Sequence, residues 1–352
     1  MALPIIQKIN GPPPLTPQIQ PPPPRPQIQR PQPIPKIQRE PLRFQQEPPS
    51  PPILQLTQSR IKSYFNRNLQ YLSDRINQID ICNTYRLSDL KILYVPSGNP
   101  LNYNACLVND RLFFRSVKNI GEDDIMTCKI ENFKYVLDSV KILSLSSSFN
   151  NNKHVEDPRV ILHKDNYFVC YTDGYNIGIA KLDLECNTIY SHYLSKPDGV
   201  NFEGGDGREK NWLPISNGDY IDFWYGDSPR TFLKYCDTGT SLKFCSYLKT
   251  SQRVKSNFGN IRGGCAPIDY DDNGIKIWFF HTLFRGKYRI GAYLTKGLDI
   301  IKITPQPILS GNHIVFPCGA IQCDGDFYIS MGIQDKDIGI LKVSRDLEFV
   351  DV

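Results

Sequence analysis

Five apolar segments of this 352-residue chain carry polar or charged side chains at or beside their first residue, although a strand that enters a core is normally apolar. One of them, EKNWLPI at residues 209–215, places a carboxylate, an ammonium group and an amide directly before a tryptophan. Carboxylates and guanidinium groups bind hydroxyl groups or anions through short hydrogen bonds, and a protonated carboxyl group can act as a general acid. The five segments are NYNACLV from Asn102, EDPRVIL from Glu156, EKNWLPI from Glu209, IRGGCAPI from Ile261 and HIVFPCGAI from His313.

The five segments recur at a nearly constant interval, because their starts lie roughly 50–55 residues apart, a period typical of propellers and solenoids. Each is followed by a polar turn and an aromatic-rich strand such as YFVCYTDG, and most units end in a shorter strand such as IGIAKLD. Turn residues between such runs favour tight hairpins. The sequence therefore predicts an all-β fold, a five-bladed β-propeller over residues 95–352. A β-sandwich would not give five units that share one internal order.

The propeller arrangement predicts where the polar starts lie. The first strand of each blade lines the central axis, so five equivalent starts converge at one mouth of the channel. The sequence thus predicts a ligand site at this mouth, centred on Asp157, Arg159, Glu209, Asn211 and Asp335. The alternative is that these polar groups only hydrogen-bond neighbouring blades and hold the ring together.

The first 53 residues differ from the rest in composition. They contain 18 of the 28 prolines, and six Lys or Arg against two acidic residues, which gives +4 of the formal net charge of +5. We expect a Pro-rich disordered tail over residues 1–53, because it has too few apolar residues to offset the entropy of ordering. PQIQ at 17–20 recurs at 26–29 and as PKIQ at 35–38. The tail is either a solvated polyproline II spacer or a strip that docks in an aromatic groove of a protein partner.

Residues 57–82 change to a helical pattern. Their apolar positions follow a 4-4-3-4-3 spacing, which predicts one amphipathic helix: Ile61, Phe65, Leu69, Leu72, Ile76 and Ile79. This apolar stripe packs either on the main domain or on a second copy of the chain.

Composition and missing motifs exclude several classes of protein. Without the tail the chain is close to neutral, so we expect no nucleic acid partner. No apolar run is long enough for a signal peptide or for a membrane span of roughly 18–20 residues, so we expect an intracellular protein with reduced cysteines. The ten cysteines form no CxxC pair and the five histidines lack ligand spacing, so neither a metal nor a cofactor is expected.

Several motifs between residues 95 and 350 resemble, in their order and spacing, glycoside hydrolase family 130, five-bladed propellers that phosphorolyse or hydrolyse β-mannosides. They are Arg115 at the end of RLFFR, EDPR at 156–159, the run from Pro267 to His281, TPQPIL at 304–309, VFPCG at 315–319 and MGIQDKDIGI at 331–340. The resemblance implies a carbohydrate ligand, with inorganic phosphate as co-substrate if the chain is a phosphorylase. In this family a carboxylic acid protonates the leaving oxygen through a sugar hydroxyl, and phosphate attacks the anomeric carbon. Hydrolytic members need a second carboxylate that activates water.

The resemblance also implies roles for individual residues. Asp157 and Arg159 would hold the sugar in the deepest subsite beside Asp335, and the Trp212 ring would stack on a pyranose face. The expected substrate-binding residues are Asn104, Arg115, Asp157, Arg159, Lys210, Asn211, Trp212, Arg262, His281 and Asp335.

Blade three departs from the family pattern. The family's catalytic acid is the aspartate of a Lys-Asp pair, and the matching pair in this chain is Lys210-Asn211. An amide cannot donate a proton as a general acid. The basic residue that holds phosphate on the next strand is also missing from the run FWYGDSP, which begins at Phe223. In this blade the chain is more similar to propeller modules that accompany glycosyltransferases.

These residues leave three functions open. The first, which we favour, is a glycan-recognising propeller with a degenerate catalytic centre. The second is an active β-mannoside glycosidase or phosphorylase that uses Glu209 as the acid, for which Glu209 needs a raised pKa that the adjacent Lys210 would oppose. The third is a structural or assembly protein that acts through its Pro-rich tail.

Overall fold

The computed structural model of the chain describes residues 90–95, 97, 99, 101–119, 122–146, 154–194, 211–227, 230–250, 252, 254–311 and 314–352. The tail expected at 1–53 and the helix expected at 57–82 lie outside the described residues, so both stay predictions. Within the described residues the only helix is one 3-10 turn, η2 (Leu137–Ser139). No helix of this part is long and apolar enough to cross a membrane.

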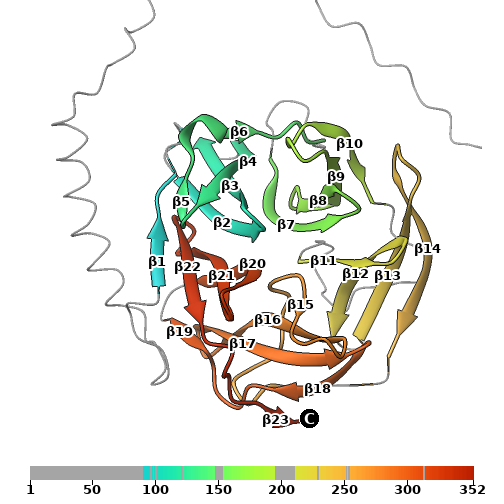
Figure 1. Ribbon diagram of the computed structural model, residues 1–352, viewed down its shortest axis with the longest axis vertical. Coiled ribbons are helices and arrows are strands. Elements are labelled where there is room, and N and C mark those ends of the chain that lie inside the picture. Colours follow the sequence, from blue (N-terminus) through green and yellow to red (C-terminus); the bar gives the residue numbers. More distant parts are fainter. Residues whose placement is uncertain are drawn as a thin grey trace, which may run out of the picture. The chain divides into compact units, whose positions relative to one another are not determined.

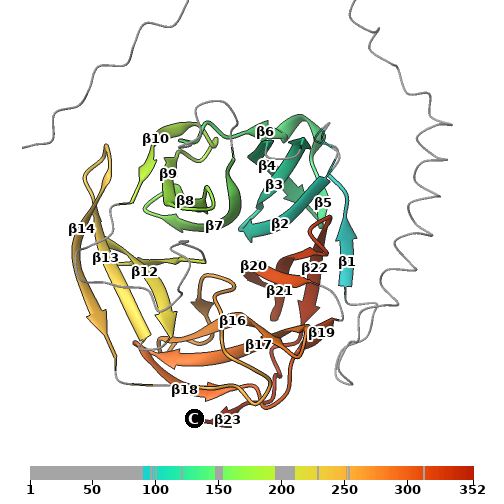
Figure 2. The same cartoon turned by 180° about the vertical axis from the view of Figure 1, so that it is seen from behind.

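Five antiparallel sheets follow one another around a central axis, which confirms the five-bladed propeller (Figure 1, and Figure 2 from behind). Blade one consists of β2 (Leu101–Val108), β3 (Arg111–Asn119), β4 (Glu122–Glu131), β5 (Lys134–Tyr135) and β6 (Lys141–Ile142). Blade two consists of β7 (Glu156–His163), β8 (Asn166–Thr172), β9 (Ile177–Leu182) and β10 (Thr188–Tyr193). Blade three consists of β11 (Leu213–Asn217), β12 (Tyr220–Asp227), β13 (Arg230–Asp237) and β14 (Leu242–Lys249).

The last two blades take strands from both ends of the described chain. Blade four consists of β15 (Ile268–Asp269), β16 (Ile275–Phe284), β17 (Lys287–Lys296), β18 (Asp299–Ile303), β19 (Leu309–Gly311) and β23 (Val350–Asp351). Blade five consists of β20 (Val315–Cys323), β21 (Asp326–Ile333), β22 (Asp337–Val343) and β1 (Leu90–Leu93). Since β1 pairs with β22, from Leu90 opposite Leu341 to Leu93 opposite Ile338, backbone hydrogen bonds close the ring. This closing strand lies before residue 95, where the sequence predicted the propeller to begin.

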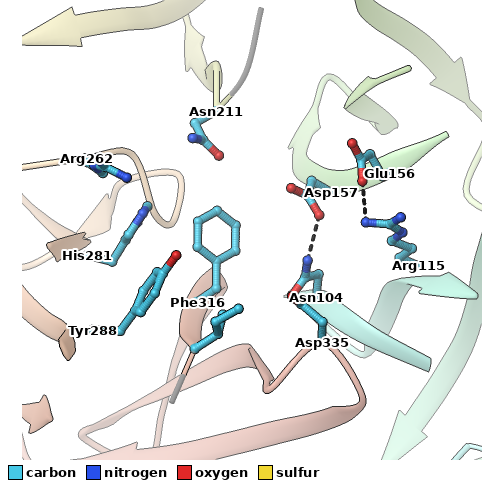
Figure 3. Close-up of a pocket in the computed structure, with 11 residues that line it drawn as sticks. Asn104, Arg115, Glu156, Asp157, Asn211, Arg262, His281, Tyr288, Phe316 and Asp335 are labelled. Carbon is cyan, nitrogen blue, oxygen red and sulfur yellow. Dashed lines mark hydrogen bonds and ion pairs between the residues drawn. The ribbon is translucent and has the colours of Figure 1, made fainter. Parts of the chain in front are cut away.

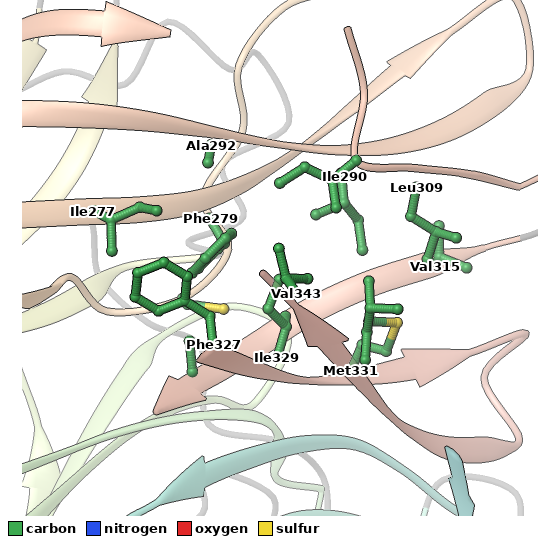
Figure 4. Packing of buried hydrophobic residues seen from close by; sticks show 14 of the residues in the cluster. Ile277, Phe279, Ile290, Ala292, Leu309, Val315, Phe327, Ile329, Met331 and Val343 are labelled. Atoms are coloured by element: carbon green, nitrogen blue, oxygen red, sulfur yellow. The ribbon is translucent and has the colours of Figure 1, made fainter. Parts of the chain in front are cut away.

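The hydrophobic core lies between the blades. Each neighbouring pair of blades buries its own apolar cluster. Between blades four and five, the rings of Phe279 and Phe327 pack with centroids 5.6 Å apart, next to Ile290 and Ile329 (Figure 4). Burial of one such phenylalanine stabilises the fold by about 1.5–3 kcal/mol. The aromatic-rich middle strands thus join the blades, and the inner strands are left to line the channel.

The two mouths of the channel differ in chemistry. At the C-terminal ends of the inner segments, one partly buried aliphatic side chain from each blade lines a cavity of about 660 Å³: Val108, Leu162, Ile215, Ile268 and Ile321. The first two of these lie 54 residues apart, and each later one lies 53 residues after the one before it. We call this end the aliphatic mouth. The N-terminal ends of the same segments form the opposite, polar mouth.

Candidate functional site

A cavity of about 320 Å³ opens at the polar mouth, and all five blades contribute to its wall (Figure 3). Its volume lies at the lower end of the range for small-molecule sites. The lining residues are Asn104, Arg115, Glu156, Asp157, Asn211, Arg262, His281, Tyr288, Ile314, Phe316 and Asp335.

Four of the lining residues have a left-handed backbone: Asn104 (φ 50°), Asp157 (φ 57°), Asn211 (φ 61°) and Asp335 (φ 51°). This conformation is unfavourable for residues with a Cβ atom, although Asn and Asp tolerate it best. In β2 and β7 the pairing register shifts at the same places, between Tyr103 and Cys106 and between Glu156 and Arg159. Bulges of this kind re-aim side chains, and strained backbone of this kind clusters at ligand sites.

Asp157 and Asp335 form an acidic side of the cavity. The Asn104 amide donates a hydrogen bond of 2.6 Å from Nδ2 to Asp157 Oδ1, and the other Asp157 oxygen faces the cavity (Figure 3). No hydrogen bond to the Asp335 carboxylate comes from the described residues. Burial and the charge of Asp157 raise the pKa of Asp335, and Arg115 opposes that shift. The Asn104–Asp157 hydrogen bond joins blades one and two. Asp157 therefore helps to hold neighbouring blades together, as in the alternative prediction, and it also faces the cavity.

Arg115 is fixed at the edge of this acidic side. Its Nη2 lies 2.7 Å from Asp123 Oδ2, its Nη1 forms an ion pair with Glu156, and its guanidinium lies over the Tyr103 ring. His154 Nδ1 lies 2.6 Å from the same Asp123 oxygen. Asp123, His154 and Glu156 are close enough together to hold a metal ion. Because Arg115 already binds both carboxylates, a metal ion there would have to compete with its charge.

The opposite side of the cavity is basic and aromatic. His281 is buried, and desolvation lowers its pKa to about 3, so its ring is neutral at physiological pH. Its Nδ1 lies 2.6 Å from the Gly263 carbonyl oxygen and therefore donates that hydrogen bond, which leaves Nε2 as an acceptor. Arg262 is exposed beside it, and the Phe316 and Tyr288 rings pack against the imidazole.

The structure brings seven of the ten expected substrate-binding residues to one cavity: Asn104, Arg115, Asp157, Asn211, Arg262, His281 and Asp335. Figure 3 shows the Asn211 amide directed toward the cavity from blade three. Glu209 and Lys210 lie outside the described residues, so their roles stay predictions.

Two expected residues are placed differently, and the prediction for them needs correction. Arg159 is 1% exposed, lies over the Phe316 ring and donates from Nη1 to the Pro158 and Asp157 carbonyl oxygens. Trp212 is 2% exposed and packs edge-on against Phe223 and Tyr225. Arg159 therefore lies behind the cavity wall, and the Trp212 ring belongs to the core and cannot stack on a sugar.

Four further lining residues were not predicted from the sequence: Glu156, Tyr288, Ile314 and Phe316. Glu156 directly precedes Asp157 in the EDPR motif, which was a usable signal. Tyr288 and Phe316 lie in ordinary aromatic-rich runs, where the sequence does not mark them as different from core residues.

The fold and this cavity define a five-bladed β-propeller with a polar axial site. A family model described as beta-1,4-mannooligosaccharide phosphorylase matches residues 73–352, and the chain belongs to glycoside hydrolase family 130. No curated protein sequence matches the chain.

Two solved structures share the fold at low sequence identity, and a third is reported with them. The β-1,2-mannobiose phosphorylase from Listeria innocua is 14% identical with a TM-score of 0.51, and the match covers 76% of this chain and 94% of that one. A putative glycoside hydrolase from Parabacteroides distasonis is 13% identical with a TM-score of 0.50, over 77% and 98% of the two chains. A GDP-Man-dependent mannosyltransferase from Leishmania mexicana is 14% identical with a TM-score of 0.48, over 84% and 97%.

Proposed function

We propose that the polar mouth recognises a β-mannoside-type glycan and that its catalytic centre is degenerate. The observation that carries this proposal is the way in which the Asp157 carboxylate is held at the cavity of a chain that belongs to glycoside hydrolase family 130. The Asp157 backbone is left-handed, Asn104 holds one carboxylate oxygen, and the other oxygen faces the cavity. A carboxylate held in this way accepts strong hydrogen bonds from sugar hydroxyl groups.

The two sides of the cavity suit different parts of a sugar. Asp157 and Asp335 offer acceptors for hydroxyl donors on one side. On the other side, neutral His281 offers one further acceptor at Nε2, and the Phe316 ring offers an apolar surface for the C–H groups of a pyranose. Because neither His281 nor Phe316 is charged, this arrangement favours a neutral sugar ring at the base of the cavity.

The amide of Asn211 supports the proposal that this chain has lost the proton donor of the family. Asn211 lines the cavity at the position where the resemblance places the catalytic aspartate. Its amide can hydrogen-bond a sugar hydroxyl as donor or acceptor, but it has no acidic proton to give to a leaving group. We therefore propose binding without phosphorolysis by the family's route.

An active enzyme is the second candidate, and Arg262 favours it. This guanidinium is exposed at the cavity, and no carboxylate of the described residues pairs with it. It is available for an anion, such as inorganic phosphate as co-substrate. In that case Glu209 is the residue we propose as proton donor.

Titration calorimetry of the full chain with β-1,2- and β-1,4-linked mannobiose tests the proposed recognition. We expect saturable binding of at least one disaccharide that Asp157→Asn weakens, because the neutral amide loses the charge-assisted hydrogen bonds. Asp219→Asn is a matched control, since Asp219 is exposed on the turn after β11 and pairs with Lys164. No binding of any mannoside, or equal binding by both variants, would count against the proposal.

A further inference from the structure

Two cysteines lie next to each other on the outer strands of blade three. Cys236 of β13 pairs with Lys243 of β14, and Cys245 follows two residues later on β14. Cys245 has no residue opposite it, because the register of the two strands shifts at this point. The extra residue forms a β-bulge between the two strands. The Cys245 thiol donates a hydrogen bond of 3.5 Å to the carbonyl oxygen of Lys243, the residue opposite Cys236, and neither cysteine lines the cavity at the polar or the aliphatic mouth.

Solvent access distinguishes this pair from the other cysteines. Cys245 is exposed and Cys236 is partly buried. Cys323 is also exposed, but the group that influences its thiol is Asp324 and not a second thiol. The remaining cysteines of the described residues are buried, and these are Cys106, Cys128, Cys170, Cys186, Cys265 and Cys318. Within that part of the chain, Cys245 is therefore the exposed cysteine with a partner thiol beside it.

We propose that Cys236 and Cys245 form an oxidation site at which a peroxide converts the two thiols into a disulfide bond. The Cys245 thiolate attacks one oxygen of hydrogen peroxide, the O–O bond breaks, and a sulfenic acid and hydroxide are formed. The Cys236 thiolate then attacks Cys245 Sγ, the S–S bond forms and a second hydroxide leaves. The two thiols lose two electrons, and their two protons convert the hydroxides into two molecules of water. A thiol reductant reverses the reaction.

The surroundings of Cys245 set the rate of this reaction. Partial desolvation raises the pKa of the Cys245 thiol, the Cys236 thiol adds to that shift, and Lys234 opposes it. Because the thiolate is the nucleophile, oxidation is expected to become faster as the pH rises toward that pKa. The product ties β14 to β13 across the hairpin turn that contains Thr238 and Ser241. Such a cross-link restricts the unfolded chain, so the oxidised protein should melt at a higher temperature than the reduced protein.

Peptide mass spectrometry of the oxidised full-length chain tests the site. Trypsin cleaves after Lys234, Lys243 and Lys249, so the two cysteines fall on separate peptides, 235–243 and 244–249. After treatment with hydrogen peroxide and alkylation of the remaining thiols, we expect these two peptides to be joined. Their joint mass should be lower than the sum by two hydrogen atoms, and reduction should separate them. Recovery of Cys245 only as an alkylated thiol or as a sulfenic acid overturns the proposal.

A Cys236→Ser variant provides the matched control. Without the second thiol, the sulfenic acid of Cys245 persists, so dimedone, which traps sulfenic acids, should label Cys245 in this variant and not in the wild type. Cys323 serves as an internal standard, because its labelling should be the same in both proteins. Equal labelling of Cys245 in both proteins, or a linked peptide that joins Cys245 to Cys323, contradicts the assignment.

Discussion

The two mouths of the channel are built from the same five inner segments, yet they follow different rules. At the aliphatic mouth the five blades present nearly the same kind of side chain at a nearly constant spacing, from Val108 to Ile321. At the polar mouth the starts of the same segments carry Asn104, Asp157 and Asn211, with Arg262 and Phe316 in the last two blades. Packing of the ring requires similar side chains from every blade. An asymmetric ligand requires different contacts from each blade.

This difference indicates that the loss of folding stability caused by the site is concentrated at the polar mouth of the channel. Four residues that line the polar mouth, Asn104, Asp157, Asn211 and Asp335, have a left-handed backbone, and the pKa of the Asp335 carboxyl group is raised, whereas Asn109 is the left-handed residue among those that line the aliphatic mouth. Such features reduce stability and persist where function requires them. Substitutions at the polar mouth should therefore change binding more than stability, and substitutions at the aliphatic mouth the reverse.

Asp157→Ala should give the largest effect on binding. Loss of the hydrogen bonds that its carboxylate accepts should weaken mannoside binding by about 10- to 100-fold, while thermal unfolding changes little. Asp165→Ala, an exposed turn residue at the other end of blade two, is the control and should bind like the wild type. A variant at position 157 that unfolds readily but still binds sugar would show that Asp157 is mainly a tie between blades.

Gly332→Ala should affect both properties. A Cβ atom at this position would collide with Asn104 Oδ1, and so would push the amide away from Asp157. We expect weaker mannoside binding and a free energy of unfolding lower by about 1–3 kcal/mol in chemical denaturation. Gly226→Ala is a matched control, because an added Cβ there meets no atom within 4 Å. Unchanged binding by Gly332→Ala would mean that the Asn104–Asp157 bond does not organise the site.

Ile321→Ala should have the opposite effect to a substitution at the polar mouth, because it should lower stability and leave mannoside binding unchanged. It removes part of a half-buried side chain at the aliphatic mouth, which should lower the free energy of unfolding by about 1–2 kcal/mol, less than for a fully buried isoleucine. Calorimetry with the same mannoside should give an unchanged affinity. A clear loss of affinity would show that the two mouths are coupled.

Asp335→Asn should give the smallest effect, visible as a dependence of stability on pH. Because the folded-state pKa of Asp335 is raised, its contribution to stability is fully present below the unfolded-state pKa and is lost as the pH rises through the folded-state value. The variant should therefore melt slightly above the wild type at pH 7, and this difference should vanish toward pH 3. A variant that is less stable than the wild type at pH 7 would contradict this reading of Asp335.

Much of the fold could be predicted from the sequence, because each blade repeats the same order of strands at a nearly constant interval along the chain. The closing strand β1 was missed, since four residues such as LKIL carry no sign of their distant partner β22. In the site, the polar residues predicted at the blade starts line one cavity. Arg159 and Trp212 do not, because a register shift or a left-handed residue just before each of them changes which side chains face the channel. Such a change is set by backbone geometry that residue types alone do not reveal.

The central claim is that the polar mouth binds a glycan but lacks the family's acid. Incubation of the unaltered full-length protein with β-1,2- and β-1,4-mannobiose, with and without inorganic phosphate, tests it most directly. We expect no phosphate-dependent release of mannose 1-phosphate and no release of mannose above the uncatalysed rate, even at concentrations where calorimetry shows binding. Robust turnover by the wild type that Glu209→Gln abolishes would contradict the account and identify Glu209 as the proton donor.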